Sequence, residues 1–282
     1  MPIGTAMDEA TRRAYLDALG IPLWVPRTVT PAAQADAGSA GAGSARAGSA
    51  RVGWAERSDA HREPVASALD TGPADPVGGA YGRAPAEAIG LAVPVEMLDW
   101  PALRERVAAC TACPLHAART QTVFGVGSER ARLMIVGEAP GADEDRQGEP
   151  FVGRAGQLLN AMLRAIGLER GDVYIANVLK CRPPGNRNPS LEEAAACEGF
   201  LRRQIALIAP ALILSVGGIA ARNLLGTDAP VGKLRSAVHE VGVHRVPCVV
   251  TYHPAYLLRQ PDEKAKAWQD LQLVARLLRE SA

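Results

Sequence analysis

Short apolar runs recur along the C-terminal two thirds of the chain, and segments with helical periodicity lie between them. The apolar runs predict buried β-strands at residues 132–136, 173–176, 211–216 and 246–251. The helical segments lie at residues 153–166, 190–209, 218–225 and 263–280. Strands that alternate with helices are typical of a parallel sheet with helices on both faces. We therefore expect an α/β fold over residues 97–282, as a three-layer α/β/α domain with a four-stranded parallel core sheet.

Helix start signals support two further boundaries. Ser190 has a glutamate, Glu193, three residues later, which is a capping-box pattern. Pro101 suits the first turn of another helix, whose apolar stripe includes Leu103 and Val107.

The N-terminal third shows a different pattern. Residues 8–20 have the spacing of a short amphipathic helix, and a proline-bounded apolar tail follows. Between residues 31 and 96 the composition falls to Ala, Gly, Ser, Pro and Arg, and such a tract buries too little apolar surface to offset its ordering entropy. We expect a short amphipathic segment at 1–30, a disordered low-complexity linker at 31–96, and the folded domain at 97–282.

Charge and composition add mild constraints. Residues 1–96 hold 8 Lys/Arg and 11 Asp/Glu, whereas residues 97–282 hold 23 and 19. The basic bias of the second part is weak evidence for a polyanionic partner. No run of about 18 apolar residues predicts a membrane span. We expect no secretory signal and a cytoplasmic protein, in which cysteines are more often metal ligands or inert thiols than disulfides.

Four of the five cysteines have a suggestive spacing. Cys110 and Cys113 form a C-x2-C pair, whereas Cys181 and Cys197 form a C-x15-C pair, too open for a second zinc knuckle. Thiolates from a loop, a strand end and a helix suit an iron–sulfur cluster. From spacing alone, a zinc site and unrelated thiols remain alternatives. Cys248 lies within a predicted strand and is interpreted as a core thiol.

Polar groups follow three of the predicted strands. The first strand leads into Glu138 and an acidic loop that ends at Asp145, the second ends at Asn177, and the fourth leads to His253. Because the carboxyl ends of parallel strands open on one crevice, these side chains are expected to converge. A solvated acidic turn and a structural histidine are the alternative interpretations.

Two residues near this edge have the chemistry to hold a planar base. The Asn177 amide offers one acceptor and two donors, which suits an amide-like base edge. Phe151 follows a proline in a Gly-rich turn, and it is either core packing or a stacking platform for a flipped base.

The chain carries a set of motifs that resembles the family 4 uracil-DNA glycosylases, the iron–sulfur members of the uracil-DNA glycosylase superfamily. The motifs are residues 137–141, 150–156, 177–183 and 253–256, together with the four cysteines. The resemblance covers about 97–282 and does not include 1–96. It implies a DNA-repair hydrolase that flips uracil out of DNA, hydrolyses its N-glycosidic bond and leaves an abasic site. It also implies a 4Fe-4S cluster on Cys110, Cys113, Cys181 and Cys197.

The resemblance assigns the base pocket. Glu138, Ala139 and neighbouring backbone amides would line it, and Phe151 would stack on uracil. Asn177 would read the uracil edge, and His253 would face the O2 side of the base.

The residue that orients the attacking water stays open. The relatives that are fastest on uracil place an aspartate two residues after the motif glycine, where this chain has Ala139. Glu138, Glu144 or Asn186 takes that role, or the enzyme relies on stabilising the uracil anion alone.

Basic and apolar residues near the strand ends are predicted to contact DNA. The phosphate candidates are Lys180, Arg182, Arg187, Arg235 and Arg259. Tyr256 and Leu257 lie in a segment that resembles the loop filling the gap left by a flipped base.

A different class of function is a catalytically weak or covalently trapping uracil-DNA-binding module tethered to a replication or repair partner. Covalent trapping in relatives uses a basic insertion after the second strand, and residues 185–189 show none, which favours turnover. We expect a monomer that binds single- or double-stranded uracil-containing DNA. Residues 8–26 either fold back on the domain or bind a replication or repair protein through their apolar face.

Overall fold

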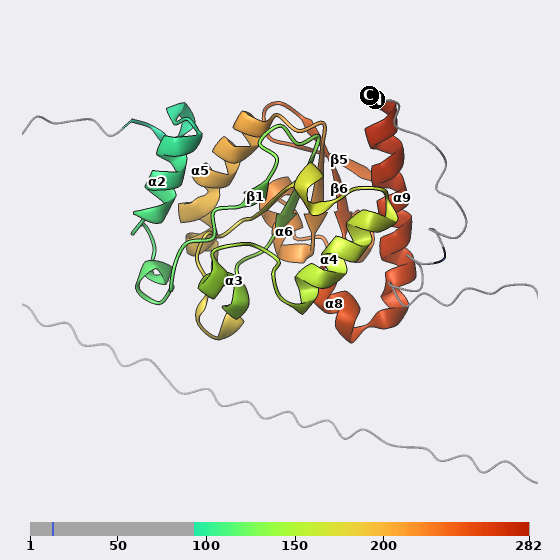
Figure 1. Ribbon diagram of the computed structural model, residues 1–282, viewed down its shortest axis with the longest axis horizontal. Coiled ribbons are helices and arrows are strands. Elements are labelled where there is room, and N and C mark those ends of the chain that lie inside the picture. The colour runs from blue at the N-terminus through green and yellow to red at the C-terminus, as the bar shows by residue number, and fades with distance from the viewer. Residues whose placement is uncertain (1–12, 14–92, 282) are drawn as a thin grey trace, which may run out of the picture. The chain divides into compact units, whose positions relative to one another are not determined.

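The computed structural model describes Arg13 and residues 93–281. The segment predicted at 1–30 and the linker predicted at 31–96 lie almost entirely outside the described residues. Residues 93–281 form an α/β domain whose sheet is covered by helices on both faces (Figure 1). No helix within this part of the chain is long and apolar enough to cross a membrane.

The sheet has six strands in the order β1-β3-β2-β4-β6-β5. The four central strands are parallel, which confirms the predicted core: β2 (Leu133–Gly137), β3 (Tyr174–Asn177), β4 (Leu212–Val216) and β6 (Val246–Thr251). β1 (Val126–Gly127) and β5 (Val238–Val241) pair antiparallel at the two edges. The sequence pattern missed both edge strands because β1 has two residues and β5 buries only Val241.

The helices follow the predicted alternation. The α-helices are α2 (Trp100–Ala108), α3 (Ala142–Gln147), α4 (Arg154–Ala165), α5 (Leu191–Ile208), α6 (Gly218–Leu225), α7 (Val231–Leu234), α8 (Pro254–Arg259) and α9 (Lys264–Glu280). Short 3-10 helices lie at Val95–Met97, Pro114–Ala117, Arg170–Asp172, Pro184–Asn186 and Pro261–Glu263. The predicted capping box of α5 is present, since Ser190 Oγ accepts from Glu193 N at 3.1 Å and Glu193 Oε2 accepts from Ser190 N at 2.9 Å.

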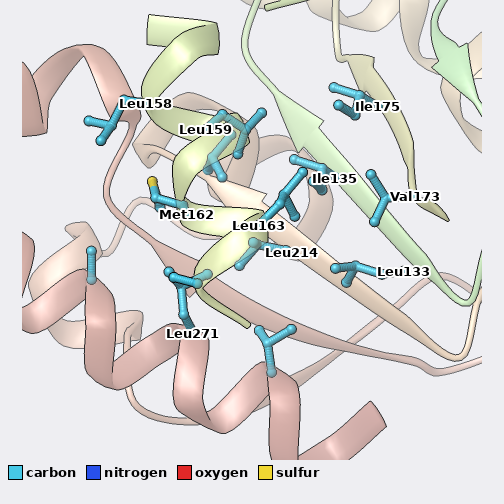
Figure 2. Close-up of a cluster of buried hydrophobic side chains, with 14 of the residues drawn as sticks. Leu133, Ile135, Leu158, Leu159, Met162, Leu163, Val173, Ile175, Leu214 and Leu271 are labelled. Carbon is cyan, nitrogen blue, oxygen red and sulfur yellow. The ribbon is translucent and has the colours of Figure 1, made fainter. Parts of the chain in front are cut away.

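The two faces of β2 build two cores, because successive side chains of a strand point to opposite faces. Leu133 and Ile135 join a cluster with α4 and α9, whereas Met134 and Val136 join one with α5 and α6. Figure 2 shows the first cluster, in which the leucines of α4 lie beside β2. In Figure 1, α2 and α5 lie to the left of the strands, α9 lies to the right, and α4 and α8 lie below β5 and β6.

The acidic stretch after β2 differs from the prediction of a loop, because its residues form α3. Gly141 is the N-cap, and three acidic residues occupy the first turn, where the helix dipole favours negative charge. Glu144 Oε2 accepts from Gly141 N at 3.1 Å, which closes this end of the helix.

A buried ion pair joins α9 to Arg235 at the end of α7, and a hydrogen bond joins α9 to the end of β6. Asp270 is fully buried, and Arg235 Nε donates to its Oδ2 at 3.1 Å, while Thr251 Oγ1 donates to the same oxygen at 2.8 Å. The prediction that Arg235 contacts a phosphate is therefore wrong. Removing one partner of such a buried pair typically costs about 3–5 kcal/mol, so Arg235 is committed to the fold.

Candidate active site

A cavity of about 460 Å³ opens at the carboxyl edge of the sheet. Seven predicted site residues line it: Glu138, Ala139, Glu144, Phe151, Asn177, Asn186 and His253. Three predicted DNA contacts, Arg187, Tyr256 and Arg259, line it as well. These residues meet because β2, β3 and β6 are parallel and end at the same edge. The volume lies in the range of small-molecule sites.

Glu144 ties together the two loops that frame this cavity. Its Oε2 accepts from Gly141 N at 3.1 Å, and its Oε1 accepts from Val152 N at 3.0 Å and Gly153 N at 3.1 Å. A carboxylate that accepts several backbone N–H groups is strongly held. The structure therefore gives Glu144 a clear part in shaping the cavity wall.

Glu138 is the carboxylate of the cavity with the fewest contacts. Its side chain makes no hydrogen bond or ion pair with the described residues, and burial raises its pKa above the ordinary value. Its main chain is well held, since Leu179 N donates to Glu138 O at 3.1 Å and Val178 N donates to Gly137 O at 3.0 Å. The loop after β2 is thus fixed while the Glu138 carboxylate stays available.

Phe151 occupies a backbone conformation that side chains rarely adopt, with φ of 55°. Arg170 holds it there, donating to Pro150 O at 2.5 Å and to Phe151 O at 3.4 Å. α4 packs directly below, because a Cβ at Gly156 would lie 1.7 Å from Phe151 O. The Phe151 ring stacks on the His253 ring at a centroid distance of 5.6 Å and an interplanar angle of 29°.

Asn177 is a buried polar side chain with unmet hydrogen-bonding capacity. Its Oδ1 has no partner among the described residues. Gly137 lies opposite it in the β2–β3 register, and a Cβ there would come within 2.4 Å of that oxygen and 2.7 Å of the Phe151 ring. Glycine at 137 is therefore needed for the amide and the ring to lie this close. An unsatisfied buried oxygen in a cavity wall suits a ligand that donates a hydrogen bond.

His253 is held as a neutral imidazole with a defined tautomer. Ala255 N donates to His253 Nδ1 at 3.1 Å, so the ring proton resides on Nε2. Burial, with a smaller contribution from the Arg259 guanidinium, lowers the pKa of His253 to about 4. At neutral pH the side chain therefore offers one N–H donor and no charge.

The four predicted cysteine ligands share a second, smaller cavity. Cys110 follows α2, Cys113 precedes a 3-10 helix, Cys181 lies four residues beyond β3, and Cys197 lies on α5. The fifth cysteine is fully buried in β6 and does not line this cavity.

Hydrogen-bond donors surround the sulfur atoms of this cavity. Arg119 Nη1 donates to Cys181 Sγ at 3.1 Å, and Lys180 N donates to Cys197 Sγ at 3.4 Å. Within residues 93–281, no three His, Cys, Asp or Glu side chains lie close enough to hold a single metal ion. The donor set thus consists of four thiols around a cavity, with N–H groups aimed at two of them.

Two predicted DNA contacts are buried. Lys180 is 1% exposed and its Nζ donates to two protein oxygens, so the prediction that it contacts a phosphate is wrong. Leu257 is also 1% exposed and belongs to the core beside α4 and α9, so it does not fill a gap in DNA. The next residue, Leu258, is 36% exposed. Both predictions fail because the side chains are buried, and the sequence around each residue gives no sign of that burial.

Two of the three remaining basic candidates pair with protein groups near the cavity. Arg182 Nε donates to Asn186 Oδ1 at 2.8 Å, and Arg187 pairs with Glu193 at 2.6 Å while lining the cavity. Arg259 makes no hydrogen bond or ion pair with the described residues. Sequence reasoning missed Arg170 and Arg119, because Phe151 lies 19 residues from Arg170 and Cys181 lies 62 residues from Arg119, which leaves no local signal for either contact.

Comparisons with known proteins place these observations in a family context. A family model described as the uracil DNA glycosylase superfamily matches residues 124–272. A type-4 uracil-DNA glycosylase of Thermotoga maritima is 49% identical over 157 residues, which are 55% of this chain and 81% of that protein. One of Archaeoglobus fulgidus is 44% identical over 61% of this chain and 89% of its own length. A type-5 uracil-DNA glycosylase of Pyrobaculum aerophilum is 32% identical over 149 residues, which are 46% of this chain and 64% of that protein.

We expect the imidazole of His253 to titrate near pH 4, well below the ordinary value of about 6.5. Because the unfolded chain binds this proton more readily, the neutral ring contributes stability above about pH 6.5 that is lost as the pH falls through about 4. Proton–carbon NMR across a pH series measures the midpoint. The variant His253→Gln identifies the resonance among the five histidines, and a midpoint near 6.5 would contradict the proposed tautomer and burial.

Proposed function

Because the chain belongs to the uracil DNA glycosylase superfamily, we propose that it is a DNA-repair enzyme that removes uracil from DNA. It flips a uracil nucleotide out of the helix, hydrolyses the bond between uracil N1 and the sugar C1′, and leaves an abasic site for base excision repair. The observation that carries this proposal is the convergence of Phe151, Asn177 and His253 on one cavity at the carboxyl edge of the sheet. The relatives named type-4 uracil-DNA glycosylases support the same reaction.

Base recognition follows from the shape and polarity of the cavity. A base in the cavity would have an aromatic face beside it in Phe151, and stacking with hydrogen bonding is how flipped bases are read. The Asn177 amide complements the N3–H and O4 of uracil, because it supplies both an acceptor and a donor. Its unpartnered Oδ1 makes a base with an N–H at that edge the favourable ligand.

Bond cleavage leaves negative charge on the departing base. The bonding electrons of C1′–N1 pass to uracil and spread over its carbonyl oxygens, while the sugar becomes oxocarbenium-like. A donor fixed in advance at one of those oxygens stabilises the transition state more than the ground state. His253 has this form, since Ala255 N occupies Nδ1 and leaves Nε2–H for the ligand. We assign Nε2–H to the O2 side of the base.

The attacking water completes the hydrolysis. Among the three candidates, Glu144 already accepts three backbone N–H groups, and Asn186 Oδ1 already accepts from Arg182. Glu138 lines the cavity with both carboxylate oxygens uncommitted to described residues. We therefore propose Glu138 as the group that orients the water, with Glu144 and Asn186 shaping the walls around it.

DNA outside the base pocket is proposed to meet the rim of the cavity. Arg182, Arg187 and Arg259 are the phosphate candidates that remain after the burial of Lys180 and Arg235. Tyr256 lines the cavity. Leu258 is exposed and lies on the same helix, α8, one turn after the helix begins. These two replace the pair Tyr256 and Leu257 as the residues that fill the space left in the duplex.

We expect the purified protein to release free uracil, with many turnovers, from single- and double-stranded oligonucleotides that contain one uracil. His253→Ala and Asn177→Ala should each slow release at least about tenfold, because each removes a preorganised contact to the base. His244→Ala and Asn223→Ala, at an exposed turn and on α6, serve as matched controls. A wild-type protein that releases no uracil contradicts the proposal, and a stable protein–DNA adduct in place of turnover supports the trapping alternative.

We further propose that Cys110, Cys113, Cys181 and Cys197 hold a 4Fe-4S cluster. Four thiols that surround a cavity suit a multi-atom cluster, because a single zinc ion needs its sulfur ligands at about 2.3 Å from one point. The N–H donors from Arg119 and Lys180 fit sulfur atoms that carry negative charge. When bound, such a cluster would act structurally by cross-linking the segments that carry its ligands.

Protein purified without oxygen should then be brown and contain about four irons per chain. Replacing any of the four ligands, as in Cys197→Ala, should lower the iron content and the visible absorbance. Cys248→Ala is the matched control, since this thiol is buried in β6 away from the cavity, and it should retain both signals. One equivalent of zinc without visible absorbance would contradict the cluster and leave the glycosylase proposal intact.

Residues 8–26 are proposed to bind a replication or repair protein, on the strength of their apolar residues and the low-complexity tract that follows. We also propose a monomer that acts in the cytoplasm. Deleting residues 1–94 should leave uracil release from short oligonucleotides unchanged within about threefold, a shift of under roughly 1 kcal/mol. A truncated protein that folds and keeps its iron but loses most activity would assign the N-terminal segment to the enzyme.

A further inference from the structure

Lys180 is a lysine whose amino group lies wholly inside the protein. Its side chain is 1% exposed, and Nζ donates to Asn177 O at 2.8 Å and to Gln204 Oε1 at 2.7 Å. Lysines are rarely buried, since removing an amino group from water costs free energy unless it is well paired. The buried position of Lys180 therefore points to a role for its amino group that a neutral side chain would not fill.

Lys180 borders the cysteine cavity. Lys180 lines that cavity, precedes Cys181 in sequence, and donates its backbone N–H to Cys197 Sγ at 3.4 Å. Cys197 and Gln204 are seven residues apart on α5, which is two helical turns and places both on one face. The helix thus presents a sulfur ligand to the main chain of Lys180 and an amide to its side chain.

Lys180 is also connected to the base pocket, through Asn177. Asn177 is the last residue of β3 and lines the larger cavity, and its main-chain oxygen accepts from the Lys180 amino group. The two residues after Asn177 also donate from their backbone N–H groups to the loop that carries Glu138. The five-residue span from Asn177 to Cys181 is therefore bonded to both sites at once.

We propose that Lys180 is a positioning residue through which the cysteine site holds Asn177 in the orientation that reads the base. The inference rests on the proposed function of both sites. The amino group ties Asn177 O to Gln204 Oε1 on α5, the helix that carries Cys197, and its bond to Asn177 O fixes the peptide from which the Asn177 side chain projects. Loss of Lys180 then acts on the reaction through Asn177, while the side chain itself touches neither DNA nor water.

The test is a double-mutant cycle on the iron-loaded enzyme. Lys180→Met keeps most of the length of the side chain and removes its donors, and it is combined with Asn177→Ala. In the wild-type background we expect Lys180→Met to slow single-turnover uracil release about tenfold, with a smaller change in KM. In the Asn177→Ala background the same substitution should cost less than about twofold, because interacting residues are non-additive. Equal losses in both backgrounds would overturn the proposal.

A second readout does not depend on activity. Because a positive donor near the sulfur atoms raises the reduction potential of a cluster, Lys180→Met should lower that potential at unchanged iron content. The control Lys233→Met makes the same substitution at an exposed position on α7 and should leave the rate and potential unchanged. A potential equal to that of the wild type would remove the link between Lys180 and the cysteine site.

A further variant keeps the proposal testable if Lys180→Met loses its iron. Gln204→Met removes the second acceptor of the amino group, together with the bonds from Gln204 Nε2 to Phe124 O and Tyr174 Oη, and leaves Lys180, Asn177 and the cysteines unsubstituted. It should slow uracil release in the wild-type background and have less than about a twofold effect when Asn177 is alanine. Equal effects in the two backgrounds overturn the inference alone, whereas a wild-type protein without uracil release overturns the proposed function.

Discussion

The parallel pairing of β2 with β3 is the constraint from which the pocket follows. It sets Gly137 directly beside Asn177, and the missing side chain at 137 lets the amide and the Phe151 ring approach the same point. The His253 ring then stacks on Phe151 from the end of β6. Three groups from distant parts of the sequence thereby share one wall of the cavity.

Much of this arrangement could be predicted from the sequence, because it depends on local patterns. Continuous apolar runs identify the four central strands, and a serine followed by a glutamate identifies the start of α5. Polar residues just after those strands must lie at one edge, so the convergence of Glu138, Asn177 and His253 could be expected from the pattern, whereas Ala139, Glu144 and Asn186 were named from the family resemblance. The edge strands escaped prediction because they are short or half exposed, and α3 escaped because its acidic residues are typical of a turn.

The errors concern burial that depends on distant partners. Lys180 has the composition of a DNA contact, but an amide 24 residues away on α5 draws its amino group inward. Leu257 and Leu258 are indistinguishable by residue type, and only the seating of α8 against α4 and α9 decides which one is covered. Buried polar pairs of this kind connect the pocket loops to the helices behind the sheet, and in a low-dielectric interior they favour one arrangement over its neighbours.

The seven-residue spacing on α5 has a consequence for how this helix can change over evolution. Each residue advances an α-helix by about 100°, so inserting or deleting a single residue between Cys197 and Gln204 would swing one of them off the shared face. The solvent side of the helix can accept many exchanges of residue type, because the contacts to Lys180 do not involve it. Homologous chains are therefore expected to differ in residue type along α5 while keeping the same number of residues between these two positions.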